Sequence, residues 1–127
     1  MAKYKLKPPG SRQEKAEKDY LARYVFAGLT DINTGFDVWP IRYFTEEEFR
    51  IVLSRIKEHR LGLFGIEPFK DGEWYNCRTF EEYGDNPTDP NWYMTVFDMF
   101  REKGGQNLQW SASYYVPDAL LQFENEQ

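Results

Sequence analysis

The dipeptide Asp71-Gly72 constrains the fold of this chain more than any other feature of its sequence. Asp-Gly is a preferred pair for the two-residue type I′ turn that joins antiparallel strands. Strand-like sequence flanks it on both sides, so residues 61–80 are predicted to form a β-hairpin in which Phe69 faces Trp74. Pro68 has no N–H to donate, and we therefore expect its strand to be an edge of the sheet or to be bulged there.

Continuing this register would bring several polar side chains onto one face of the hairpin. It aligns Glu67 with Asn76 and Gly65 with Arg78, close to the ring of Trp74. A carboxylate, an amide, a guanidinium and an indole could form a pocket for a small molecule or glycan, or a weak active site. They could equally form a solvated face on which Glu67 and Arg78 make an ordinary ion pair.

Three other segments have helical patterns, and a fourth has a strand pattern. The spacing of apolar residues predicts helices over 11–28, 46–60 and 90–103. Strict alternation over 107–115 predicts a half-buried strand. Each predicted helix starts at a residue that can cap it, namely Ser11, Thr45 or Asp89.

The order of these elements predicts an α+β fold. Three helices would pack on a small, mainly antiparallel sheet of about three strands, in two layers. A length of 127 residues favours one domain, which we place at residues 11–127. Residues 1–10 end in Pro8-Pro9-Gly10 and are predicted to be a flexible basic arm.

Cysteine content and hydropathy indicate a cytoplasmic protein. Cys77 is the single cysteine, which excludes an intramolecular disulfide and a cysteine-based metal site. The N-terminus lacks the apolar region of a secretory signal, and no run approaches the ~18 apolar residues of a membrane span. We therefore expect a reducing compartment and no membrane contact.

The net charge of −5 is unevenly distributed along the chain. Residues 1–24 contain seven Lys or Arg and three Asp or Glu, whereas residues 25–127 contain nine and eighteen. The acidic body would repel phosphate, so direct binding of DNA or RNA is disfavoured. The charge suits a basic protein partner, although it could also serve only to keep the chain soluble.

No catalytic constellation is visible in the sequence. There is no glycine-rich phosphate loop, no nucleophile elbow and no H-E-x-x-H motif. His59 lies near the end of a predicted helix, where its charge would favour the helix dipole, and Cys77 lies on the apolar face of the hairpin. We expect a protein that is not an enzyme and needs no metal or cofactor, although its many carboxylates leave an acid–base pair open.

A polar loop at residues 81–91 is the strongest candidate for a partner-binding surface. It has four carboxylates and no Lys or Arg, and aromatic side chains lie beside them. Acidic clusters steer basic partners and raise association rates. The alternative is a solvated loop whose last Asp only caps the next helix. The predicted contact residues are Glu81, Glu82, Tyr83, Asp85 and Asp89.

The runs LGLFGIE at residues 61–67 and DGEWY at residues 71–75 resemble small bacterial immunity proteins of polymorphic or contact-dependent toxin systems. The resemblance implies a compact, acidic, non-catalytic protein that blocks the basic active site of a nuclease-type toxin. It identifies no functional residue, and the basic arm would have to point away from the toxin. A third possibility is an oligomeric scaffold that pairs through the Pro68 edge or through exposed aromatic residues.

Overall fold

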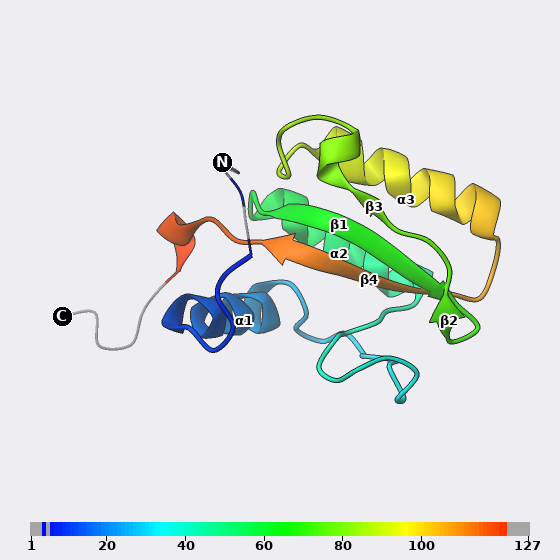
Figure 1. The fold of residues 1–127 in the computed structure, drawn as a ribbon, viewed down its shortest axis with the longest axis horizontal. Coiled ribbons are helices and arrows are strands. Elements are labelled where there is room, and N and C mark those ends of the chain that lie inside the picture. The colour runs from blue at the N-terminus through cyan, green and yellow to red at the C-terminus, as the bar shows by residue number, and fades with distance from the viewer. Residues whose placement is uncertain (1–3, 5, 122–127) are drawn as a thin grey trace.

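The computed structural model describes residue 4 and residues 6–121. Within these residues it contains three α-helices and a four-stranded antiparallel sheet, which confirms the predicted α+β class (Figure 1). Two short 3₁₀ helices complete the fold, at Phe80–Glu82 and Asp118–Leu120. Among residues 4 and 6–121, none of the helices has the length and hydropathy of a transmembrane span.

The sheet is built around one central strand. β1 pairs along its length with β4 on one side and with the short strands β2 and β3 on the other. The second arm of the hairpin is thus interrupted, which gives four strands where the sequence predicted about three. The bounds are Gly62–Lys70 for β1, Glu73–Trp74 for β2, Arg78–Thr79 for β3 and Leu108–Tyr115 for β4.

The predicted hairpin turn and its first register are confirmed. The turn residues Asp71-Gly72 both have positive φ, as a type I′ turn requires, and Phe69 pairs with Trp74. Beyond that pair the predicted register is wrong by one residue, because Arg78 lies opposite Ile66 and not opposite Gly65. An extra residue is accommodated between β2 and β3.

Pro68 explains where the register slips. The backbone N–H groups of Tyr75 and Asn76 both donate to the carbonyl of Pro68, at 3.2 and 3.4 Å. The N–H and C=O of a residue in a strand point to the same side, so the missing N–H of Pro68 faces this irregular stretch. Neither expectation for Pro68 holds as stated, because β1 is central and the extra residue lies in the opposite arm of the hairpin, at residues 75–77, and not in β1.

The helices α1, α2 and α3 span Arg12–Tyr24, Glu46–Glu58 and Pro90–Gly104. Each begins where its capping residue predicted, and the side chains of Ser11, Thr45 and Asp89 accept hydrogen bonds from backbone N–H groups in the first turn. Helix α1 ends four residues before the expected Gly28. Its last apolar residues, including the buried Phe26, leave the helical path to enter the core.

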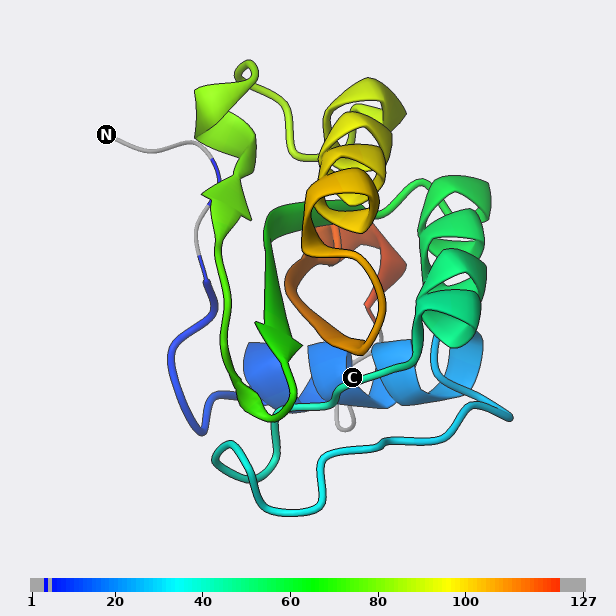
Figure 2. The same cartoon turned by 90° about the vertical axis from the view of Figure 1, so that its right-hand side faces the viewer.

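Helices α2 and α3 cover one face of the sheet, while α1 runs alongside the edge formed by β4 (Figures 1 and 2). The fully buried Trp110 of β4 lies at the centre of the core between sheet and helices. Its ring stacks on Phe49 of α2 at 5.4 Å between centroids and contacts Phe97 of α3 at 4.8 Å. This aromatic packing fixes the position of β4 relative to both helices.

Coil segments, rather than helices, cover much of the other face of the sheet. Near one end, Tyr4 of the predicted arm packs on Phe80 and Tyr115. Near the opposite end, Phe36 and Tyr43 pack on the ring of Phe69. Lys7 of the arm also forms an ion pair with Asp118, whereas residues 1–3 and 5 lie outside the described residues. A small hollow remains on this face of the sheet.

Candidate functional site

The predicted acidic surface at residues 81–89 is partly used to hold the loop itself. The carboxylate of Asp89 caps α3 by accepting from the N–H of Asn91 at 2.9 Å. Glu82 accepts from the N–H of Thr79 at 2.9 Å and lies 3.8 Å from the guanidinium of Arg78. Glu81 and Asp85 are exposed. These two are therefore the carboxylates of the loop that are most available to a partner.

Tyr83, the aromatic member of that predicted surface, is both anchored and accessible. Its ring stacks on Trp92 at 6.1 Å, and 40% of its surface remains exposed. The indole N–H of Trp92 in turn donates to the carbonyl of Pro87 at 3.1 Å. The loop is thus attached to the start of α3 by aromatic packing as well as by its cap.

The alternative patch is divided by the register slip. Its Trp74 and Glu67 do meet, since the indole N–H donates to the carboxylate at 2.7 Å. Arg78, however, pairs with Glu82 and not with Glu67, because it lies opposite a different residue of β1. The amide oxygen of Asn76 accepts from the N–H of Cys77 at 2.7 Å. The four side chains therefore do not form one cluster.

Glu67 nevertheless lines a small cavity on the sheet, which we call the face hollow. It has a volume of about 210 Å³, and its wall includes Cys77, Ser111 and Ile41. Burial first, and then the carboxylates of Glu67 and Glu82, raise the pKa of the Cys77 thiol above its ordinary value. The thiol therefore stays protonated, which is unfavourable for a nucleophile. The cavity is smaller than the ~300 Å³ at which drug-sized ligand sites begin.

A larger cavity, the edge hollow, adjoins the face hollow. Its volume is about 420 Å³, and α1, residues 40–42 and β4 residues 112–114 form its walls. The two cavities share Ile41, Ala112 and Ser113 and so meet at Ile41. The lining of the edge hollow comprises Leu6, Glu14, Glu17, Lys18, Leu21, Phe26, Pro40, Ile41, Arg42, Ala112, Ser113 and Tyr114.

Four consecutive apolar residues, 38–41, form an exposed rim beside these hollows, and we call them the apolar rim. Trp39 is the most exposed large apolar side chain among the described residues, at 89%, and Val38 is 65% exposed. Isolated exposed apolar residues are common, but a contiguous group that includes a bare indole is typical of interaction surfaces. The apolar rim is therefore the strongest marker of a contact surface in the described part of the molecule.

The loop that carries the apolar rim is fixed by Asn33. Its side-chain amide donates to the carbonyls of Asp37 and Ile41, at 3.2 and 2.9 Å. Its amide oxygen accepts from the N–H groups of Gly35 and Asp37, at 3.1 and 3.3 Å. The phenol of Tyr43 also donates to the carboxylate of Asp37. This network holds the rim in one conformation without a helix or a strand.

Sequence reasoning missed the apolar rim. The signal was present, because four apolar residues follow one another inside a segment bounded by turn residues. A loop normally exposes its side chains, so such a run predicts exposed apolar surface. The edge hollow had no comparable signal, because its walls come from three segments far apart in the chain.

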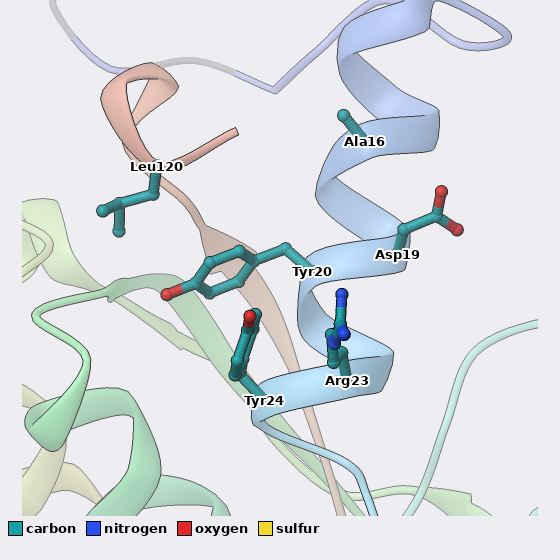
Figure 3. A pocket seen from close by; sticks show the side chains of 6 residues that line it. All are labelled: Ala16, Asp19, Tyr20, Arg23, Tyr24 and Leu120. Atoms are coloured by element: carbon teal, nitrogen blue, oxygen red, sulfur yellow. The ribbon is translucent and has the colours of Figure 1, made fainter. Parts of the chain in front are cut away.

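A third cavity, of about 240 Å³, lies along α1 beside Leu120 of the 3₁₀ helix Asp118–Leu120 (Figure 3). The rings of Tyr20 and Tyr24 lie 4.6 Å apart, and Asp19 points away from both. His59 packs its imidazole against Tyr24 at 5.4 Å between centroids. His59 does not line this cavity, and its imidazole contacts the rings of Tyr20 and Tyr24.

No group of three or more His, Cys, Asp or Glu among residues 4 and 6–121 is arranged to hold a metal ion. Comparisons of the chain with models of protein families, with curated proteins and with solved structures found no match. Function must therefore be inferred from the surface of the molecule.

Proposed function

We propose that this chain is a protein-binding domain whose partner contacts the apolar rim. The observation that carries the proposal is the 89% exposure of Trp39 on a loop held by the Asn33 network. Tryptophan is enriched among the residues that dominate binding energy at interfaces. A loop whose backbone is already held also avoids the entropic cost of ordering that backbone when the partner binds. An exposed indole on a loop with a held backbone is therefore suited to anchoring a partner.

The specific form that we propose is an immunity or inhibitor protein for a basic partner. Residues 25–127 have a formal charge of −9, and the exposed Glu81 and Asp85 contribute to it. Such a body attracts a cationic surface and repels nucleic acid, as the inhibitor of a nuclease-type toxin would need to do. The resemblance of residues 61–67 and 71–75 to immunity proteins supports the same role.

The test is a binding measurement with a matched pair of variants. The wild-type chain is used to isolate a partner from its source, and Trp39→Ser and Ile51→Ser are then compared by calorimetry. Ile51 lies on α2 and is not part of the apolar rim, and 38% of its surface is accessible. We expect Trp39→Ser to raise the dissociation constant about 30-fold, equivalent to about 2 kcal/mol, and Ile51→Ser to leave it unchanged.

Trp39→Ser removes little buried surface and should retain the melting temperature of the wild type, and a melting curve of Ile51→Ser establishes that this control is folded. Equal affinity of the wild type and Trp39→Ser would contradict the proposed role of the rim. Retention of the partner when its basic surface is neutralised would contradict the inhibitor role but not protein binding itself.

A further inference from the structure

The outer edge of β4 follows the alternation of an antiparallel strand. Trp110 exchanges two backbone hydrogen bonds with Phe44, each of 2.9 Å, on the side away from β1. Because backbone groups alternate sides along a strand, those of Ala112, Tyr114 and Val116 must also point away from β1. The backbone N–H and C=O groups of Ser111 and Ser113 accordingly point toward β1 and pair with it.

Only the ends of this outward row are satisfied. Trp110 has its partner in Phe44, and the carboxylate of Glu17 from α1 accepts a hydrogen bond from the N–H of Val116. Between them, within residues 4 and 6–121, no hydrogen bond links the outward N–H or C=O groups of Ala112 or Tyr114 to another residue. Two donors and two acceptors are thus left open in a line.

The edge hollow lies directly against these open groups. Residues 40–42 do not continue the pairing that begins at Phe44, and the resulting gap is closed on its far side by α1. Leu21 and Phe26 supply apolar wall, while Glu14, Glu17, Lys18 and Arg42 line it with balanced formal charge. Unpaired strand groups beside an apolar wall are the two features by which an added β-strand is recognised.

We propose that the edge hollow receives an extended segment of a partner protein, which pairs with Ala112 and Tyr114 as an additional strand beside β4. The inference rests on the proposed protein-binding function and states how the partner is held. The segment would be short, because Ala112 and Tyr114 span about 7 Å of strand and the flanking groups are occupied. Its side chain facing Leu21 and Phe26 would be apolar and uncharged.

A second copy of this chain fits the edge less well than a single segment. Helix α1 runs alongside β4, and residues 40–42 form the opposite wall of the hollow (Figures 1 and 2). A strand that is part of a sheet brings its neighbouring strands and helices with it. These would meet both walls, whereas an isolated extended segment has only its own side chains to place.

The first test requires no partner. In amide hydrogen exchange measured by NMR on the free protein, Ala112 and Tyr114 should exchange at least tenfold faster than Ser111 and Ser113. Peptides selected from a random seven-residue phage library should then slow exchange at Ala112 and Tyr114 at least tenfold. A selected peptide with its central amides N-methylated should lose this protection. Equal rates at the four amides of the free protein, or selected peptides that leave Ala112 and Tyr114 unchanged, would overturn the inference.

Ala112→Pro provides a second test, because proline removes only an outward N–H and is tolerated at a free strand edge. It should keep the wild-type melting temperature and weaken the selected peptides at least tenfold, and Glu102→Ala, at an exposed position of α3 outside the hollow, serves as the control. If Ala112→Pro does not fold, the hydrogen-exchange experiment with the N-methylated peptide tests the inference in its place. A partner lost by Trp39→Ser but retained by a folded Ala112→Pro would refute strand addition and leave the proposed function intact. Protection of these amides by self-association alone would also refute it.

Discussion

Individual buried side chains show where the core is imperfect. Tyr93 of α3 is fully buried, and its hydroxyl has no hydrogen-bond partner among the described residues. Burial, together with the nearby carboxylate of Asp89, raises the pKa of Tyr93 to about 12. A buried hydroxyl without a partner loses its hydration and gains nothing in return. The side chain is held by the packing of its ring alone.

Tyr93→Phe should therefore increase the free energy of unfolding by about 1 kcal/mol at pH 7, measured by urea denaturation. The difference should widen above about pH 10, because tyrosine ionises there in the unfolded chain while Tyr93 stays neutral in the fold up to about pH 12. Ionisation of residue 93 in the unfolded chain therefore destabilises the wild type in this range. The variant has no hydroxyl at this position and is not affected. A destabilised variant would mean that the hydroxyl has a partner.

At the scale of elements, close approach of β1 to the loop before α3 depends on a glycine. A Cβ added to Gly62 would lie 2.7 Å from the carbonyl oxygen of Pro87, a backbone atom that also accepts from the N–H of Leu63 at 3.0 Å. The loop cannot withdraw without breaking this hydrogen bond. The pairing of strand and loop therefore requires a residue without a side chain at position 62.

Gly62→Ala should lower the free energy of unfolding by about 2 kcal/mol, the usual cost of forcing an extra methyl into a packed site. Gly84→Ala is the matched control, since a Cβ there meets nothing within 4 Å. It should be neutral, or stabilising by about 0.5 kcal/mol, through the unfolded chain. Thermal unfolding of the two variants measures the difference, and equal melting temperatures would show that the loop can move.

Elements with local signals were predictable from the sequence, and elements that depend on distant contacts were not. Capping residues fixed the starts of the helices, and Asp71-Gly72 fixed the turn, because these signals act within a few residues. The register beyond Pro68 depends on how the chain accommodates a missing N–H in a central strand. The early end of α1 depends on the burial of Phe26 in a core formed by residues distant in the sequence.

The candidate site was less predictable than the fold. Trp74 and Glu67 were expected to meet and do so, whereas Arg78 was placed with Glu67 by a register that the chain does not follow. The structure reassigns Asp89 to capping, as one interpretation of the acidic loop allowed. The edge hollow lies between α1, residues 40–42 and β4, and no sequence pattern within one of these segments predicts that the three lie together.

For the whole molecule, the proposed partner should be attracted by charge before contact. The body of residues 25–127 is strongly acidic, and the loop exposes Glu81 and Asp85. Long-range attraction of this kind accelerates association and weakens with salt, and it has little effect on dissociation. The charge and the apolar rim would therefore control different steps of binding.

The double variant Glu81→Gln with Asp85→Asn should slow association with a basic partner about threefold at low ionic strength, with dissociation nearly unchanged. The dependence of the association rate on salt should weaken as well. Glu102→Gln, a neutralisation at an exposed position of α3, should change the rate less. Surface plasmon resonance at several salt concentrations measures both rates. Identical salt dependence in the wild type and the double variant would exclude the loop from steering.

The interruption opposite Pro68 limits where further strands could extend the sheet. One margin of the sheet is only the fragments β2 and β3, two residues each, with an irregular stretch between them. Such short pieces cannot template a foreign chain, which is the hazard that long flat margins present for aggregation. Extension of the sheet is thus confined to a single side, and any fibril or complex that lengthens it would have to begin from β4.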